Sequence, residues 1–175
     1  RVGGDSQGIF FWRPIAPIGF SILGDCVTMT PTPPSRPVVV ITDAEGLTKL
    51  PLRYERACAY ASHQPGEMPT VWWPIAPDGY CALGCIVTSS EGEPPLTAMR
   101  CVRNEVVRAS DYGGFINQRG VGAHLRHVKN SSSTFHVFAQ GLKPVVPIDL
   151  RAPLMPERLK TTVKNSFSLA MDETA

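Results

Sequence analysis

The chain has 175 residues, of which 43% are hydrophobic and 18% charged, and its formal net charge at pH 7 is +2. This length fits one domain with a substantial core, and the small net charge argues against a nucleic-acid partner. We expect neither a membrane-spanning helix nor a signal peptide, because no apolar run has the required length and flanks. The five cysteines lie within apolar runs, which favours reduced, buried thiols in a cytoplasmic protein.

A segment dense in tryptophan, proline and glycine occurs twice. The two copies, Trp12–Gly24 and Trp72–Gly84, are offset by 60 residues. In each copy, two prolines hold the chain extended after the tryptophan, and a glycine follows at the turn. Such a repeat predicts a supersecondary unit that is used at least twice, here at about 9–45 and 69–105.

The elements within each unit can be taken in chain order. Apolar strands are expected to begin at residues 20 and 80 and to close at Val27-Thr28 and Val87-Thr88, with a glycine inside each. A Pro-Pro loop and another strand follow in each copy, the strands at 37–41 and 97–102. A strand that ends near Tyr54 is expected to join the two units.

The rest of the chain is less regular. Four glycines predict a flexible loop over 111–123, neither face of an extended chain over 124–129 would be purely apolar, and the residue types over 134–138 predict a strand. Four prolines keep 143–156 extended, and a short helix over 157–165 is one alternative for the segment that follows. We therefore predict one repeat-built β domain over 1–142, and a proline-containing extended segment with a C-terminal tail over 143–175.

The predicted fold is all-β, with repeated short antiparallel strands in a β-prism or β-sandwich built from two or more similar units. Both copies contain Trp-x-Pro-x-Ala-Pro-x-Gly-Phe/Tyr-x-x-Leu-Gly, then a Pro-Pro loop and an apolar strand that ends at Asp43 or Asn104. This pattern resembles the repeats of the VPS13 family of chorein-type lipid-transfer proteins and of Vps62-related domains. The resemblance covers about residues 5–107; Phe115–Phe138 is a candidate third element without a residue-by-residue match.

The resemblance implies a role as well as a fold. In that family, the repeats form a β-rich module outside the lipid-carrying groove, and this module docks the protein to adaptors through short proline-containing peptides. The expected function is therefore a non-catalytic docking module in vesicle and lipid transport. Its expected partners are an adaptor protein or a proline-containing peptide and, as an alternative, an anionic membrane surface at an organelle, with no nucleic acid.

Four residues are candidates for the partner contact. Trp12 and Trp72 are expected to hold each corner in the core, and side chains alternate along an extended chain, so the next residues, Arg13 and Trp73, are the candidates for a surface contact. Asp43 and Asn104 end the two units, where such residues often hydrogen-bond their own turn. The alternative is that the Asn104 amide binds a peptide backbone through its donor and acceptor.

A second candidate surface is basic. Lysines and arginines are concentrated in the C-terminal third of the chain, and four of them are candidates for contact with anionic lipid headgroups. These candidate membrane-contact residues are Arg151, Arg158, Lys160 and Lys164.

Other functions have weaker signals. No nucleophile elbow or phosphate-binding glycine loop is present, so we predict no catalytic residues and no cofactor. Cysteines at 81 and 85 and histidines at 124 and 127 suggest a zinc site, but four residues of strand separate the cysteines by about 13 Å, too far for one ion. The alternative function is carbohydrate binding by a lectin-like prism, through the cluster of Asp, Gly and aromatic residues at 109–122.

Overall fold

The computed structural model describes residues 8–60, 65–117, 123–139, 141–143, 145–151 and 159–169. The described chain is all-β, as predicted, and its helical segments are the single 3-10 turns Ala44–Gly46, Leu96–Ala98 and Asn104–Val106. The strands are β1 (Phe10–Pro14), β2 (Phe20–Ser21), β3 (Cys26–Thr28), β4 (Val38–Thr42), β5 (Thr48–Lys49), β6 (Arg53–Ala59), β7 (Thr70–Ile75), β8 (Tyr80–Cys81), β9 (Ile86–Thr88), β10 (Cys101–Arg103), β11 (Val107–Ala109), β12 (Tyr112–Asn117), β13 (Ala123–Val128), β14 (Phe135–Ala139), β15 (Ile148–Leu150), β16 (Lys160–Val163) and β17 (Phe167–Leu169).

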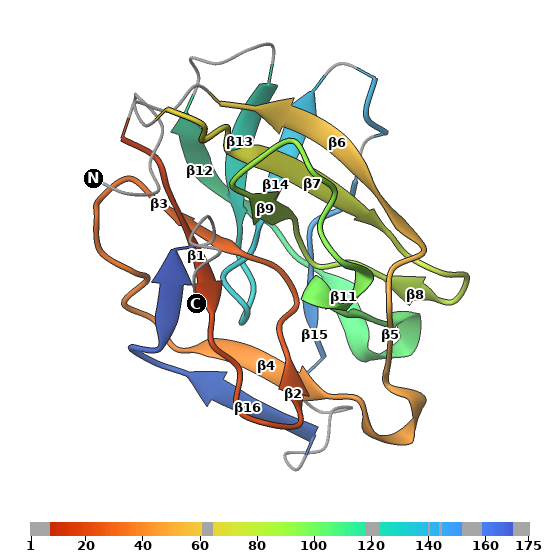
Figure 1. The fold of residues 1–175 in the computed structure, drawn as a ribbon. Helices are drawn as coiled ribbons and strands as arrows, with labels where there is room; N and C mark the ends of the chain where they lie inside the picture. The colour runs from red at the N-terminus through yellow and green to blue at the C-terminus, as the bar shows by residue number, and fades with distance from the viewer. Residues whose placement is uncertain are drawn as a thin grey trace.

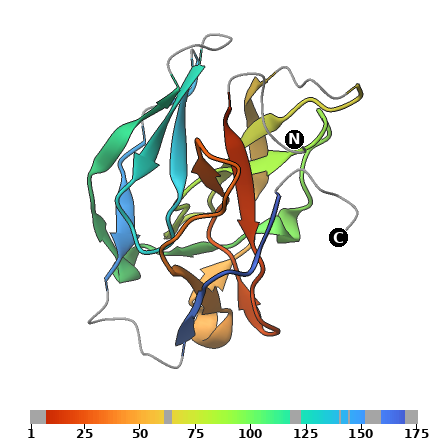
Figure 2. The same ribbon diagram turned by 90° about the vertical axis from the view of Figure 1, so that its left-hand side faces the viewer.

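Three three-stranded antiparallel sheets form the sides of the molecule (Figures 1 and 2). Their strand orders are β17-β1-β3, β6-β7-β9 and β12-β13-β14. Three smaller sheets accompany them, in the orders β16-β4-β2, β5-β10-β8 and β11-β15. One large and one small sheet belong to each of three units, which we call unit 1 (β1–β4 with β16 and β17), unit 2 (β5–β10) and unit 3 (β11–β15).

The strand register identifies the third unit. Trp12 lies opposite Cys26, Trp72 opposite Ile86, and Arg126 opposite His136, each at the same place in its sheet. Arg126 therefore occupies the tryptophan position of unit 3. Because the tryptophan and the proline-rich corner after it are both missing there, the sequence pattern alone did not give a residue-by-residue match.

The two sequence copies have the same conformation. The Trp12 and Trp72 indoles donate through Nε1 to Thr28 and Thr88 Oγ1, each at 2.8 Å. The turn bonds Phe20 N to Pro17 O and Tyr80 N to Pro77 O are both 3.0 Å. The same hydrogen bonds thus occur in both copies, with Trp72 buried and Trp12 half-buried.

The strand expected from residue 20 to residue 28 is interrupted. β2 ends at Ser21 and β3 begins at Cys26, and the same break separates β8 from β9. In the break, Asp25 N donates to Cys85 O at 2.8 Å, and Cys85 N donates to Phe135 O at 3.3 Å. The chain leaves each sheet here because it hydrogen-bonds the neighbouring unit instead.

Equivalent residues of the three units meet in one core. The central strands contribute Phe11, Val71 and Leu125, which are all fully buried. The strands paired with them contribute three buried valines at equivalent places: Val27, Val87 and Val137. Three sheets around one shared core correspond to the β-prism alternative of the predicted fold.

The C-terminal segment completes unit 1. β17 pairs with β1, and β16 pairs with β4 through four residue pairs from Lys160–Ile41 to Val163–Val38. These strands cover edges of β1 and β4 that would otherwise present unpaired backbone groups. The segment after residue 142, expected to be an extended tail, thus contributes three strands, and the helix alternative over 157–165 was wrong at Lys160–Val163.

The glycine-rich segment over 111–123 was also predicted incorrectly in part. Residues Tyr112–Asn117 form β12 instead of a flexible loop, and the register with β13 shifts between Tyr112 and Phe115. Gly113 and Gly114 lie in this irregular stretch, and the lack of a side chain at Gly113 allows β12 to pass close to His127. Residues 118–122 lie outside the described residues.

Unit 3 has a shorter corner than the other two. Arg13 and Asp25 are 12 positions apart, as are Trp73 and Cys85, whereas His127 and Phe135 are 8 apart. The missing residues correspond to the corner strands β2 and β8. The small sheet of unit 3 accordingly has only two strands, β11 and β15.

Candidate functional site

The contacts between units differ at one pair of equivalent positions. The residue after the tryptophan position is Arg13 in unit 1, Trp73 in unit 2 and His127 in unit 3. His127 lies opposite Phe135 in register, and the equivalent positions in units 1 and 2, one residue before the partners of Trp12 and Trp72, are Asp25 and Cys85. Each pair faces the next unit, so this position determines the chemistry of the three junctions, which we call 1–2, 2–3 and 3–1.

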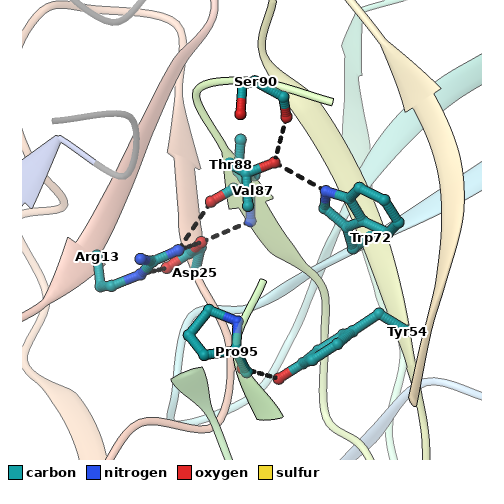
Figure 3. A network of polar contacts seen from close by, with 8 residues as sticks. All are labelled: Arg13, Asp25, Tyr54, Trp72, Val87, Thr88, Ser90 and Pro95. Atoms are coloured by element: carbon teal, nitrogen blue, oxygen red, sulfur yellow. Dashed lines mark hydrogen bonds and ion pairs between the residues drawn. The ribbon is translucent and has the colours of Figure 1, made fainter. Parts of the chain in front are cut away.

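An ion pair closes junction 1–2 (Figure 3). Arg13 donates from Nε and Nη2 to the two carboxylate oxygens of Asp25, both at 2.9 Å, and Nη2 also donates to Val87 O at 2.8 Å. Val87 N donates to Asp25 Oδ2 at 2.8 Å. Burial raises the pKa of Asp25, and the Arg13 guanidinium and the Val87 amide oppose that shift. Arg13 therefore joins two units and is not a free surface cation.

Aromatic packing closes junction 2–3. The ring of Trp73 contacts His136 edge-on, with 5.0 Å between centroids. His136 is buried, with Nε2 3.1 Å from Leu83 O and Nδ1 2.8 Å from the Tyr112 hydroxyl. Burial lowers the pKa of His136 to about 4, which keeps the imidazole neutral at pH 7. With a neutral ring, the Leu83 carbonyl favours the tautomer that is protonated at Nε2.

An apolar groove lies on the outer side of this junction. It encloses about 320 Å³ between the corner of unit 2 and the segment before β15. Trp73, Ile75 and Tyr80 line it from unit 2, and Val146 and Ile148 from unit 3. Val146 is 64% exposed, so the groove is open to solvent. The equivalent corners of units 1 and 2 pack on one buried cluster, to which Ala16 and Phe20 contribute from unit 1 and Ala76 and Tyr80 from unit 2.

Two polar side-chain groups in the groove have partners within the protein. The Tyr80 hydroxyl donates to Gly46 O at 2.8 Å, and the Cys81 thiol contacts Val102 O at 3.6 Å. The remaining lining consists of Trp73, Pro74, Ile75, Ala76, Ala82, Val145, Val146 and Ile148. The groove therefore presents mainly apolar surface with aromatic rings at two places.

Comparison with protein-family models gives one match. The model described as vacuolar protein sorting-associated protein 62, Vps62, matches residues 39–132, more than half of the chain. The chain belongs to the Vps62 family. The matched range runs from the end of unit 1 through unit 2 into unit 3, so it includes the Trp73 wall of the groove, whereas the wall formed by Val145, Val146 and Ile148 lies beyond it.

The fold of this Vps62-family domain also occurs in a solved structure. The crystal structure of GNIP1Aa from Chromobacterium piscinae superposes with a TM-score of 0.62 and 21% sequence identity. The match covers 81% of this chain and 30% of GNIP1Aa, so the chain spans about a third of that protein's length. At this identity the likeness concerns the fold alone. A search of curated proteins found none that matches the chain.

The Vps62-family structure places the four candidate partner-binding residues apart. Trp73 lines the groove, and Arg13 lies in junction 1–2. Asp43 accepts a hydrogen bond from Thr48 Oγ1 and pairs with Arg100 at 3.4 Å, so it holds its own turn. Asn104 is exposed and its backbone N–H donates to Gly79 O at 3.0 Å, one residue before Tyr80 of the groove.

The candidate membrane-contact residues do not share one element. Arg151 is exposed directly after β15 in unit 3, whereas Lys160 and Lys164 lie at the two ends of β16 in unit 1. Arg158 lies outside the described residues. The helical segments of the described chain are all single turns, none long and apolar enough for a membrane crossing.

The cysteines have protected environments. All five are free thiols, and burial raises the pKa of each, to about 11 for Cys58 and Cys81 and to about 12 for Cys101. Thiols with such values stay protonated at neutral pH. Within the described ranges, no three His, Cys, Asp or Glu side chains come together as metal ligands.

Sequence reasoning found one wall of the groove and missed the other. It singled out Trp73 but gave no role to Val146 and Ile148, which lie more than 70 positions later. A usable signal was present: two valines stand between two prolines at 144–147, in a segment too short for a strand of its own. The buried Asp25 could also have been singled out from the sequence, because unit 2 has a cysteine at the same repeat position.

Proposed function

We propose that this Vps62-family domain is a non-catalytic docking module whose groove at junction 2–3 binds an extended, proline-containing segment of an adaptor protein. The observation that carries the proposal is the apolar, aromatic-lined groove, whose Trp73 wall lies in the family-matched part of the chain.

The chemistry of the groove suits proline. The Tyr80 hydroxyl and the Cys81 thiol already have partners, so a peptide backbone that enters would find few side-chain acceptors for its N–H groups. Proline has no N–H, and a polyproline II segment is already extended, which lowers the entropy cost of ordering it. Aromatic-lined grooves are the usual docking surface for such segments. The rings of Trp73 and Tyr80 supply this kind of surface.

The size of the groove limits the ligand. About 320 Å³ accommodates a few side chains and not a folded domain. Binding through so small a patch is expected to be weak and transient, as for many short linear motifs. The overall affinity of such a module is higher when further contacts bind the same partner at the same time.

The carbohydrate alternative depended on an open cluster at 109–122. In the structure, the Tyr112 ring lies under Arg126 at 4.9 Å, and its hydroxyl is 2.8 Å from both His136 Nδ1 and Val145 O. Tyr112 is thus engaged within unit 3, and the groove supports the peptide reading better.

The test measures binding of short peptides with two prolines separated by one residue, by fluorescence anisotropy. Ile75→Asp places a charge in the groove and is expected to weaken the best peptide by about tenfold or more. Ile15→Asp is the matched control, because Ile15 is the same repeat position in unit 1 and is 55% exposed. Equal binding by wild type and Ile75→Asp would overturn the proposal.

A pull-down from lysate extends the test to the natural partner. Trp73→Ala is expected to lose a partner that wild type retains, with the fold verified by circular dichroism. Asn104→Ala tests whether the side-chain amide beside Gly79 extends the site, since only its backbone bond is seen in the structure. Retention of every partner by Trp73→Ala would count against docking at this groove.

A further inference from the structure

Junction 3–1 is open where the other two junctions are closed. A cleft of about 750 Å³ lies there, between the Pro-Pro loop of unit 1 and the shortened corner of unit 3. Its lining includes Thr28, Ser35 and Arg36 from unit 1, and His127, Lys129 and Asp149 from unit 3. Volumes of this size are typical of small-molecule sites.

The repeat explains why this junction stays open. His127 stands where unit 1 has Arg13, and Phe135 stands where it has Asp25. The guanidinium–carboxylate pair that fills junction 1–2 therefore has no counterpart here. The corner strand present in units 1 and 2 is also absent from unit 3, which removes the segment that would lie along β15.

The cleft carries a net positive charge. Arg36 and Lys129 are both exposed, and neither pairs with a carboxylate in the described part of the chain. Asp149, the acidic residue of the lining, is already held by other groups. Its Oδ1 accepts from Ser131 N, Ser131 Oγ and Leu150 N at 2.8–2.9 Å, and its Oδ2 lies 3.6 Å from Arg108.

We propose that this cleft binds a phosphate-bearing small molecule or headgroup. Arginine offers phosphate two parallel N–H donors, and lysine offers a compact charge, so Arg36 and Lys129 on opposite walls are suited to hold one anionic group between them. The hydroxyls of Ser35 and Ser133, which also line the cleft, supply further donors of the kind phosphate accepts.

The phosphate cleft and the peptide groove are separate sites. Ile148 lines the groove and Asp149, the next residue of β15, lines the cleft, because neighbouring side chains of a strand point to opposite faces. The two sites share no lining residue. Substitution at one site is therefore expected to leave binding at the other unchanged.

The test titrates the ¹⁵N-labelled domain with inorganic phosphate and with pyrophosphate at constant ionic strength. The expected result is that backbone amide signals shift in 28–36 and 127–133. The double variant Arg36→Gln with Lys129→Gln is expected to weaken pyrophosphate binding by about tenfold or more. Both residues are exposed, so the fold is expected to be retained.

The matched control removes the same charge elsewhere. Arg53→Gln with Arg56→Gln changes two exposed arginines of β6, whose ion pairs with Glu55 and Glu91 lie on the surface. This control is expected to bind pyrophosphate as wild type does. Equal weakening in both double variants would show general charge attraction and overturn the proposal, as would the absence of any shift in the cleft signals.

Vesicles distinguish the source of the phosphate. Phosphatidylcholine vesicles are compared with the same vesicles containing a phosphatidylinositol monophosphate. Binding that requires the phosphorylated lipid and is lost in Arg36→Gln with Lys129→Gln assigns the site to a headgroup. Binding of the soluble probes at the cleft without vesicle binding assigns it to a soluble phosphate compound.

Discussion

Junctions 1–2 and 3–1 are built from the same repeat and have opposite characters. In the first, Arg13 and Asp25 fill the space between units and satisfy the backbone of Val87. In the second, His127 and Phe135 occupy those positions, the corner is shorter, and a polar cleft remains. A repeat can thus convert a structural contact into a candidate site by changing two residues and omitting one short strand, while the larger, three-stranded sheet of the unit is kept.

The strongest test of this comparison breaks the closed junction. Asp25→Ala leaves the half-buried Arg13 without its carboxylate and Val87 N without an acceptor, so we expect a loss of about 3–5 kcal/mol in the free energy of unfolding. Urea unfolding measures the effect.

A compensated variant sharpens the same test. Arg13→Trp combined with Asp25→Cys copies the residues of junction 2–3 and is expected to recover part of the loss. A cost for Asp25→Ala as small as the roughly 0–1 kcal/mol of an exposed ion pair would contradict the structural role of this contact.

Lowering the pH is expected to reduce the free energy of unfolding through junction 2–3. Unfolded histidine gains a proton near pH 6.5, whereas burial holds the pKa of folded His136 at about 4. The unfolded state therefore binds more protons between these values, and stability falls as the pH falls from 6.5 to 4, by up to about 3 kcal/mol. Unfolding of wild type and His136→Gln across this range isolates the effect, because the variant lacks the titrating ring. Parallel curves for the two proteins would refute it.

The next largest loss of stability is expected from adding a side chain where units 2 and 3 are in close contact. A Cβ on Gly84 would lie 2.4 Å from Thr134 Cβ, so Gly84→Ala is expected to cost about 1–3 kcal/mol. Gly114→Ala is the control, because nothing lies within 4 Å of a Cβ there. Thermal unfolding compares them, and a variant at position 84 as stable as the one at 114 would mean that the units are not in close contact here.

The smallest expected difference in stability is between loss of the Trp72–Thr88 hydrogen bond and loss of the Trp12–Thr28 hydrogen bond. Thr88→Val leaves the Nε1 of buried Trp72 without its acceptor in the closed junction, and we expect a cost of about 1–2 kcal/mol. Thr28 lines the open cleft, where water can replace its hydroxyl, so Thr28→Val is expected to cost less, about 0.5 kcal/mol. Equal costs in urea unfolding would argue that the cleft is not hydrated beside Trp12.

The sequence predicted the parts of the fold that local chemistry determines. The tryptophan, prolines and glycine of the corners identified units 1 and 2, and β-branched and aromatic residues identified β4 and β14. Unit 3 was not matched because Arg126 and a shortened corner replace its motif. The strands β16 and β17 were missed because their partners, β4 and β1, lie more than 100 positions earlier, and no local pattern reports such pairing.

The candidate site divides in the same way. Trp73 could be identified from its place after a repeated tryptophan, whereas the walls formed by Val146 and Ile148 depend on how unit 3 packs against unit 2. The role of Arg13 was predicted from its sequence position as a surface contact, but its pairing with Asp25 follows from the register of β1 and β3. Which positions face each other across a junction is decided by tertiary packing, and a single sequence does not display it.

The pairing of β17 with β1 has a consequence for how the domain is made. The first sheet cannot be completed until residues near 169 have been synthesised, so one edge of β1 stays uncovered while units 2 and 3 are made. Contacts between such distant residues close a long loop and are expected to form late and slowly. A ribosome that stalls before β16 would therefore release a chain prone to pair its open edge with another molecule.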